Sequence, residues 1–368
     1  MLNFCCPVCK EELKLDGRTY RCINNHCFDC AKQGYVNLLQ SNKSKSKRHG
    51  DDKLMIEART EFLNTDSYKP LCDLMCKLLQ KYIPQNACVL DAGCGDCYYT
   101  GKIEKALADK NASIAGIDIS KFALIAAAKR SKNIRLAVAS VFALPTADFS
   151  CDAVLNVFSP FAPEEYARVL KSGGVLLRVI PLENHLFSLK KAVYDNPLKN
   201  PKENTDIDGF ILAESKELKY SITLDDNREI ESLFKMTPYY YKTSRTDQQK
   251  LEKLNFTLLN VRLVLVQITQ LLVCLRKLLL FICQFEVKVA EFMLQVTESG
   301  RKLGTITFLI SKLSMKFCNG LLFFRFEISD HRSQTFHTSF CHCLFRLQVT
   351  ENLLMLLNFF LKRKAPGI

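Results

Sequence analysis

Five short apolar runs, each followed by a stretch with helical spacing, constrain the fold of this chain more than any other feature. The runs consist mainly of Val, Ile, Leu and Ala, as expected of strands buried on both faces of a sheet. They occupy residues 88–92, 113–118, 134–139, 153–158 and 175–180. Strands that alternate with crossover helices form parallel sheets. The sequence therefore predicts an α/β fold with a doubly wound sheet, preceded by a mainly helical stretch at about residues 52–82.

The length and charge of the chain limit the classes of protein it can belong to. With 368 residues it has room for two or three domains of roughly 100–200 residues each. It contains 51 Lys and Arg against 38 Asp and Glu, so its formal net charge is +13. This surplus suits an anionic partner such as nucleic acid. The 48% share of apolar residues excludes a disordered or collagen-like chain.

Shifts of composition predict four segments. Residues 1–40 are rich in cysteine, and residues 41–52 begin with a polar, basic run that is typical of a linker. Residues 53–254 contain the alternating pattern. Residues 255–368 contain no tyrosine and few turn-forming residues, and we expect them to be an atypical extension without a functional domain.

No segment predicts export or insertion into a membrane. The longest charge-free apolar run, residues 263–275, is shorter than the roughly 18–20 residues that span a bilayer. The N-terminus lacks a basic segment followed by an apolar one. We therefore expect a cytoplasmic chain whose 17 cysteines are mostly thiols.

Paired cysteines near the N-terminus predict a zinc site. A Cys-x-x-Cys turn directs two thiolates at one point, and two further ligands complete the tetrahedron that zinc prefers. Four protein ligands leave no open position, so such a metal is structural. Cys6 and Cys9 form the first pair, and spacing alone allows either Cys22 with His26 or Cys27 with Cys30 as the second.

A glycine-rich turn within residues 89–100 predicts a site for a nucleoside. Gly93 and Gly95 follow a strand and precede a helix, so the main chain can approach a ligand closely there. Asp118 ends the next strand, where a carboxylate can accept both hydroxyls of a ribose. A nucleoside would then lie at the carboxyl ends of the strands.

Two neighbouring residues indicate which nucleoside binds. A dinucleotide fingerprint requires a third glycine at position 98, which is Tyr98, and a pyrophosphate is disfavoured beside the Asp91 carboxylate. S-adenosylmethionine has no phosphate and carries a sulfonium cation. The turn therefore favours S-adenosylmethionine over NAD, with helix or turn capping as the alternative role of Asp91.

Polar residues at later strand ends extend the predicted site. Ser140 follows a strand where the adenine edge would lie. Asn156 and Ser159 lie at the end of the next strand on the same rim, where they either face a substrate or stabilise a turn.

Taken together, these motifs resemble the RlmA family of 23S ribosomal RNA guanine-N1 methyltransferases. The resemblance covers the first 254 residues and none of the remainder. It rests on several segments in the family's order: Cys6-Pro-Val-Cys9, Cys22-x-x-x-His26, residues 31–39, residues 50–55, Ala58-Arg59, residues 89–100 and Met236-Thr-Pro238.

The resemblance implies a Rossmann-like S-adenosylmethionine-dependent methyltransferase domain preceded by a small zinc-ribbon domain. It implies methylation of N1 of a guanine in a 23S rRNA hairpin, with S-adenosylmethionine as the methyl donor. As ligands of a structural Zn²⁺ it selects Cys6, Cys9, Cys22 and His26. As contacts of the donor it implies Tyr68, Gly95, Asp96 and His185.

Two departures from the family bear on this interpretation. Cys97 stands where such turns commonly have a third glycine, and its side chain is expected to narrow the donor pocket. The chain from about residue 255 is expected to displace the usual closing strand of the methyltransferase sheet. We expect such a displacement to affect the stability of the sheet and the pairing of subunits into a homodimer.

The acceptor chemistry sets further requirements. Guanine N1 must lose a proton before it attacks a methyl group, and the sequence singles out no general base. The target base must leave its stack, which favours aromatic or Arg side chains around the pocket, and Tyr68, Arg59 and Arg178 are candidates. Because the cysteine-rich segment adjoins the basic linker, we predict that this segment binds the RNA and orients the hairpin.

Two rival hypotheses compete with RNA methylation. In a small-molecule methyltransferase the zinc site would only aid folding, and added rRNA would change nothing. A non-catalytic RNA-binding protein with a decayed pocket would bind no S-adenosylmethionine.

Overall fold

The computed structural model describes residues 2–40, 50–224 and 226–251 in full, and beyond them only the backbone of Glu252 and of several strands. The chain divides into two compact units, Met1–Gln284 and Phe285–Ile368, which are described separately. Most of the predicted linker, residues 41–49, lies outside the described residues.

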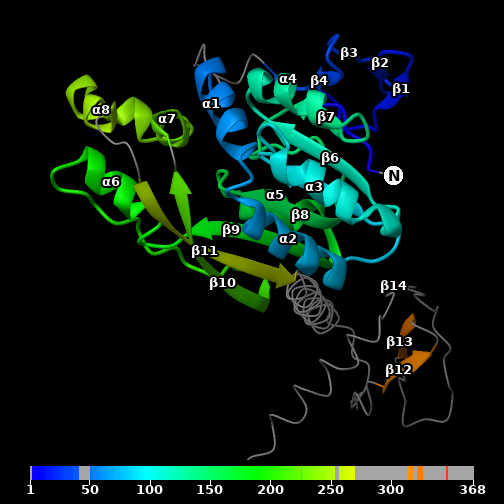
Figure 1. Ribbon diagram of the computed structural model, residues 1–368. Helices are drawn as coiled ribbons and strands as arrows, with labels where there is room; N and C mark the ends of the chain where they lie inside the picture. The colour runs from blue at the N-terminus through cyan, green and yellow to red at the C-terminus, as the bar shows by residue number, and fades with distance from the viewer. Residues whose placement is uncertain are drawn as a thin grey trace, which may run out of the picture. The chain divides into compact units, whose positions relative to one another are not determined.

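An eight-stranded sheet forms the centre of the first unit (Figure 1). Its strand order is β10-β11-β9-β8-β5-β6-β7-β4. Neighbours from β9 to β4 pair in parallel, whereas β11 is antiparallel to both β9 and β10. The strands are β4 Tyr35–Asn37, β5 Cys88–Ala92, β6 Ser113–Asp118, β7 Arg135–Val138, β8 Cys151–Val157, β9 Leu170–Pro181, β10 Ile211–Leu224 and β11 Thr257–Thr269. Strands β5 to β9 confirm the five predicted strands and the doubly wound α/β fold.

Helices lie between these strands as the alternating pattern predicts. Asp52 begins the first helix, because its side chain accepts a hydrogen bond from Met55 N at 3.0 Å. The helices are α1 Lys53–Leu63, α2 Lys69–Tyr82, α3 Tyr98–Ala106, α4 Lys121–Arg130, α5 Pro163–Val169, α6 Phe187–Val193, α7 Asn227–Lys235 and α8 Arg245–Glu252, with short 3₁₀ turns η2 Ala108–Lys110 and η3 Tyr240–Lys242. Helices α1 and α2 confirm the helical stretch predicted at about 52–82.

The sheet separates two hydrophobic clusters. In β5, Val89 belongs to one cluster and Leu90 to the other, since successive side chains of a strand point to opposite faces. Helices α1 to α4 contribute to the first cluster, with Phe62, Met75 and Ile103 fully buried among them. The second cluster combines α5 with the N-terminal segment.

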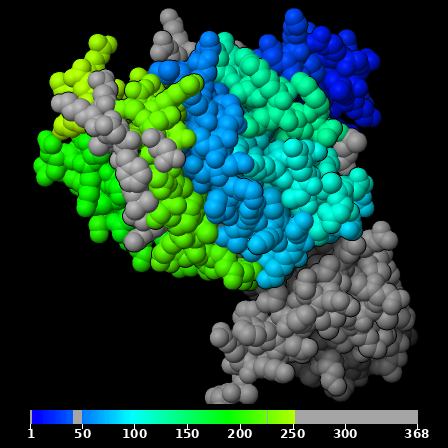
Figure 2. Space-filling model, viewed as in Figure 1, coloured from blue at the N-terminus to red at the C-terminus, as the bar shows by residue number. Residues whose placement is uncertain are grey.

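That N-terminal segment, residues 2–40, is called the ribbon below. Leu2, Phe4 and Leu13 are buried in the same cluster as the central strands. Its last strand, β4, pairs in parallel with β7 at the edge of the large sheet. Figure 2 shows the ribbon, in dark blue, as a lobe at one end of the first unit. Its own antiparallel sheet consists of β1 Lys14–Asp16, β2 Thr19–Arg21 and β3 Cys27–Asp29.

Hydrogen bonds also attach the ribbon to the domain that follows it. Cys5 N donates to Pro145 O at 2.8 Å, and Arg135 of β7 donates to Asn3 Oδ1 at 2.7 Å. Segments 2–40 and 53–254 therefore differ in sequence pattern but share one core and one sheet.

Strand β11 lies beyond the boundary that composition places at residue 254. It runs between β9 and β10, and its register on β9 extends from Leu263 opposite Pro181 to Thr269 opposite Val175. The expectation that the C-terminal extension displaces the closing strand of the sheet is therefore wrong. The physical reason is that residues 257–269 consist mainly of Leu, Val, Ile and Thr, a composition that suits a strand.

The second unit contains an antiparallel sheet with the order β12-β13-β14. Its strands are β12 Ser314–Cys318, β13 Leu321–Arg325 and β14 Phe345–Arg346. The rest of this unit lies outside the described residues, so the absence of a functional domain there stays a prediction. Within the part of the chain that the structure describes, no helix has the length and apolar character to cross a membrane.

Candidate functional site

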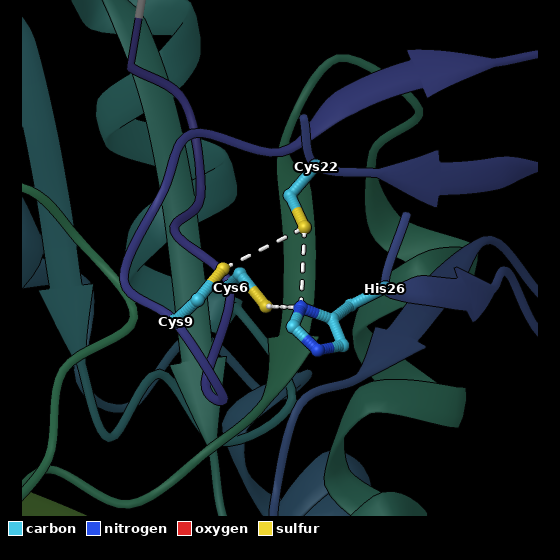
Figure 3. Close-up of side chains that lie close together, drawn as sticks. All are labelled: Cys6, Cys9, Cys22 and His26. Atoms are coloured by element: carbon cyan, nitrogen blue, oxygen red, sulfur yellow. Dashed lines mark hydrogen bonds between the residues drawn. The ribbon is translucent and has the colours of Figure 1, made fainter. Parts of the chain in front are cut away.

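Four side chains able to bind a metal converge in the ribbon. The ligand atoms of Cys6, Cys9, Cys22 and His26 all lie within 4.8 Å of one another (Figure 3). Cys9 Sγ is 3.6 Å from Cys22 Sγ, and His26 Nδ1 is 3.4 Å from Cys22 Sγ. A zinc ion with the usual Zn–S and Zn–N lengths holds tetrahedral ligand atoms about 3.5–3.8 Å apart. The donor set therefore fits a tetrahedral metal ion.

Two tight backbone turns bring these ligands together. Lys10 N donates to Cys6 O at 2.8 Å in the first turn, and Asn25 N donates to Cys22 O at 3.0 Å in the second. Lys10 and Asn25 both adopt left-handed backbone, with φ of 67° and 60°. A local hydrogen bond thus closes each of these two turns within four or five residues, which is why spacing in the sequence reveals them.

The second cysteine pair lies apart from this cluster. Cys27 is exposed and its Sγ accepts a hydrogen bond from Arg21 at 3.0 Å. Burial raises the pKa of Cys30, whereas a hydrogen bond with Asn24 is the main cause that lowers the pKa of Cys9 to about 6. A lower pKa favours the thiolate, the form that binds metals. Of the two completions that spacing allows, the fold assembles the one with Cys22 and His26.

The glycine-rich turn follows β5 in the chain and is hydrogen-bonded to the carboxyl end of β6. Gly93 N donates to Ile117 O at 2.9 Å. Gly95 N donates to Asp118 Oδ2 at 3.0 Å, while Ser120 N donates to Asp118 Oδ1 at 2.8 Å. Burial raises the pKa of Asp118, and these amide hydrogen bonds offset part of the rise. Turn and carboxylate therefore form one rigid unit.

Glycine is required at the start of the turn for two reasons. Gly93 has a φ of 91°, a conformation that other residues rarely adopt. A Cβ there would lie only 2.4 Å from Ser159 Cβ. Residue 97 behaves differently. Cys97 has a φ of 59° and a fully buried side chain that packs in the first hydrophobic cluster, so its thiol points into the core. The narrowing of the pocket by Cys97 stays a prediction.

Asp91, the penultimate residue of β5, is a buried carboxyl group with one oxygen that lacks a partner among the described residues. Its Oδ2 accepts a hydrogen bond from Thr100 Oγ1 at 2.5 Å, whereas Oδ1 has no partner among the described residues. Burial raises the pKa of Asp91 to about 7, and the nearby charge of Asp118 adds to the rise. A buried oxygen without a partner is uncommon, and a cationic ligand group would satisfy it.

The side chain of Asp96 is occupied by protein groups. Its Oδ2 accepts from Thr60 Oγ1 at 3.0 Å and from Arg130 Nε at 3.1 Å. These bonds tie α1 and α4 to the turn, and Asp96 is only 1% exposed. The donor contact that the family resemblance implies for Asp96 stays a prediction.

Three aromatic rings from distant segments pack together near the turn. The Phe158 ring stacks on His185 with centroids 5.9 Å apart and 14° between the planes, and it meets Tyr68 edge to face at 6.3 Å. Tyr68 Oη lies 3.5 Å from His185 Nε2. Tyr68 and His185, which the family resemblance alone connected, are therefore neighbours in the fold.

His185 combines burial with a free ring nitrogen. Burial, followed by the charge of Lys190, lowers the pKa of His185 to about 4, so the imidazole is neutral at pH 7. Its Nδ1 has no hydrogen-bond partner among the described residues. Burial also raises the pKa of Tyr68, so its hydroxyl stays protonated.

The polar residues at the other strand ends mostly stabilise turns. Ser140 follows β7, and its Oγ accepts from Phe142 N at 3.2 Å. Asn156 Nδ2 donates to Ser159 Oγ at 2.6 Å, and Ser159 Oγ donates to Ala92 O at 2.6 Å. For Asn156 and Ser159 these contacts favour the structural alternative, a turn that closes on itself beside Gly93.

Two of the three residues considered for a base platform have other partners. Arg178 is 5% exposed and pairs with Glu203 at 2.7 Å. Arg59 pairs with Asp51 at 2.6 Å. The sequence alone did not predict a role for Phe158. The signal for it is its position directly after a strand, between Asn156 and Ser159.

Comparison with known proteins identifies the family. Residues 4–47 match the family described as RlmA, N-terminal, a zinc ribbon, and residues 89–174 match a methyltransferase domain. The Bacillus subtilis (strain 168) protein named "Putative 23S rRNA (guanine-N(1)-)-methyltransferase YxjB" is 33% identical over 250 residues, which cover 64% of this chain and 86% of that protein. This chain belongs to the 23S rRNA (guanine-N1)-methyltransferase family.

Other similarities have a narrower extent. The "23S rRNA (guanine(748)-N(1))-methyltransferase" of Streptomyces fradiae is 36% identical over 191 residues, covering 51% of this chain and 66% of that protein. Among solved structures, the YcgJ protein of Bacillus subtilis aligns with a TM-score of 0.38 and 16% identity over 54% of this chain and 97% of its own. Family membership confirms the resemblance expected from the motifs.

Proposed function

We propose that this chain transfers a methyl group from S-adenosylmethionine to N1 of a guanine in a 23S rRNA hairpin. The observation that carries the proposal is the family membership, which spans both the ribbon and the methyltransferase domain. The site supports the proposal. At the carboxyl ends of neighbouring parallel strands lie the glycine turn, the carboxylate on the next strand and a buried carboxyl oxygen without a partner among the described residues.

Residues around the turn fit the methyl donor. Gly93 and Gly95 allow close approach of the backbone, and Asp118 offers its carboxylate to the ribose hydroxyls. The free Oδ1 of Asp91 suits a positively charged group, and the free Nδ1 of His185 suits a polar one. When bound, the donor supplies a methyl group activated by a sulfonium. Ser140 is proposed to border the adenine.

The ribbon residues fit a structural zinc ion. Cys6, Cys9, Cys22 and His26 provide four ligands at tetrahedral spacing and leave no position for a substrate. We propose that this ion stabilises the folded ribbon and that the ribbon orients the RNA. The basic sequence that follows the ribbon supports this, since Lys43, Lys45, Lys47 and Arg48 are suited to contact phosphates.

The protein's part in the reaction is to position the acceptor nitrogen opposite the methyl group and to exclude water. Methyl transfer is an in-line displacement at carbon, so alignment of the acceptor nitrogen supplies most of the catalysis. The proton on guanine N1 must leave, and no described residue is singled out as the base that removes it. The substrate implies a cytoplasmic site of action. A homodimer stays a prediction that sedimentation of the purified chain can test.

The decisive experiment is methylation of unmodified 23S rRNA by the purified full-length chain with labelled S-adenosylmethionine. We expect one N1-methylguanine, mapped by mass spectrometry and by a stop in reverse transcription, because the methyl group blocks the pairing edge. Transfer to a free metabolite, unaffected by rRNA, would favour a small-molecule methyltransferase. Absence of any heat of S-adenosylmethionine binding in calorimetry would favour a non-catalytic RNA-binding protein.

A further inference from the structure

Phe158 has an uncommon conformation for a large apolar residue. It follows β8 directly, its side chain is 43% exposed, and its backbone is left-handed with a φ of 51°. A bulky side chain in this conformation is strained. Phe149 has a similar φ and a similar exposure, so the position of Phe158 in the fold, and not its conformation alone, distinguishes it.

Phe158 also lies where parallel sheets bind ligands. The chain builds β5, β6 and β7 in one direction and then returns to place β8 on the opposite side of β5. The crevice at the carboxyl ends of such a pair of strands is the usual ligand site of doubly wound folds. The next residue, Ser159, bonds to Ala92 O at 2.6 Å, which fixes Phe158 beside the glycine turn.

The surroundings of the ring leave it partly uncovered. His185 stacks on it at 5.9 Å and 14°, and Tyr68 meets it edge to face at 6.3 Å. Both of these neighbours are buried, with exposed fractions of 8% and 2%, whereas Phe158 keeps much of its surface open. Of these three packed rings, only Phe158 is exposed to solvent.

We propose that Phe158 is the residue on which the extruded target guanine stacks. An enzyme that modifies the pairing edge of a base must take that base out of its helix, and aromatic stacking compensates for the lost neighbours. His185 is the buried member of the stacked pair and Phe158 is the exposed one. A base that stacks on Phe158 therefore continues this pair next to the donor site. This inference rests on the proposed function and adds the residue that positions the acceptor.

The test uses Phe158→Ala, Phe158→Leu and Phe158→Tyr, with Phe149→Ala as the matched control. Phe149 is 45% exposed and has a φ of 52°, nearly the same values as Phe158, but it precedes β8 at the opposite end of that strand. Both alanine variants therefore keep a Cβ in left-handed backbone and lose an exposed ring, and only the position of the ring beside the glycine turn distinguishes them.

We expect Phe158→Ala to lower kcat/KM for 23S rRNA by about tenfold or more, the range found for removing one base–aromatic stack. Phe158→Leu should behave in the same way, since it keeps apolar volume without a π face. Phe158→Tyr and Phe149→Ala should retain wild-type activity. The affinity for S-adenosylmethionine, measured by calorimetry without RNA, should be unchanged in all four variants.

Three results would overturn the inference. Full activity of Phe158→Ala or of Phe158→Leu would show that no stacking occurs on this ring. Loss of donor affinity equal to the loss of activity would assign Phe158 to the donor site. If the wild-type chain forms no N1-methylguanine, the proposed function fails and this inference fails with it. An active wild type with an equally active Phe158→Ala overturns the inference alone.

Discussion

The four-residue cluster of the ribbon and the glycine-rich turn with its neighbours (the donor turn) both gather side chains able to bind a ligand, but they do so by different means. In the ribbon, four ligands within 21 residues are brought together by two local turns. At the donor turn, Asp91 and Asp118 come from neighbouring strands, and Tyr68 and His185 are 117 residues apart in the sequence. The first site depends on short-range spacing, and the second exists only when the whole sheet has formed.

The two sites also differ in how completely they are satisfied by protein groups. Three cysteines and a histidine would saturate one tetrahedral ion, which is the arrangement of a closed structural site. The donor turn keeps Asp91 Oδ1 and His185 Nδ1 without partners among the described residues. A closed site stabilises the fold, whereas an open one is available to a ligand. Each substitution below separates these two roles.

Loss of a ribbon ligand should have the largest effect. We expect Cys22→Ser to abolish zinc binding and to unfold the ribbon, because structural zinc contributes about 10–16 kcal/mol at pH 7 in isolated finger peptides. Cys27→Ser is the control and should keep one zinc per chain, since its thiol lies outside the cluster. Metal analysis by mass spectrometry reads both, and the reverse pattern of zinc content would contradict the assignment.

Removal of the carboxylate on β6 should come next. Asp118→Ala is expected to weaken S-adenosylmethionine binding about 10- to 100-fold, because hydrogen bonds to a charged group contribute about 1.5–3 kcal/mol. Asp73→Ala, an exposed carboxylate on α2, should leave binding unchanged. Isothermal titration calorimetry measures both affinities, and equal affinities for the two variants would exclude Asp118 from the donor site.

The backbone requirement at the turn can be separated from glycine content in general. Gly93→Ala should destabilise the fold by about 1–3 kcal/mol, since its Cβ meets Ser159 and its φ is 91°. Gly101→Ala in α3 has nothing within 4 Å and should stabilise the fold by up to about 1 kcal/mol. Urea unfolding reports the two signs. A stable Gly93→Ala protein would mean that the turn has another conformation.

Donor affinity should depend on pH through Asp91. Its pKa is raised to about 7 by burial, so the carboxyl group is mainly neutral below pH 7 and charged above it. A cationic donor prefers the charged form, so affinity should fall as pH drops through 7, by at most about tenfold per pH unit. Calorimetry between pH 6 and 8 checks this. Asp91→Asn should flatten the profile, and a wild-type affinity independent of pH would count against contact with this carboxylate.

The smallest effect is expected at Cys97. Cys97→Gly relieves a left-handed backbone but removes a buried thiol and loosens the unfolded chain, so stability should change by less than about 1 kcal/mol. Donor affinity should stay at the wild-type value, because the thiol packs in the core. Tighter donor binding by Cys97→Gly would show that the thiol narrows the pocket after all.

Local features of the sequence determined the strands β5 to β9, the first two helices and the two ligand-bearing turns of the ribbon. These follow from apolar periodicity and from residue spacing, which the covalent chain fixes over a few residues. The composition of residues 257–269, mainly Leu, Val, Ile and Thr, also suits a strand, but it differs from what precedes it and so placed a boundary at residue 254.

Only the tertiary structure decided what the polar residues at the strand ends do. Arg130 and Thr60 engage the Asp96 carboxylate, and Asn156 closes on Ser159, although the sequence gives each residue the same apparent opportunity to face a ligand. The contact of His185 with Phe158 likewise joins segments that no spacing relates. Long-range partners compete for each polar atom in the folded chain, so the groups left open for chemistry are known only after those partners have been placed.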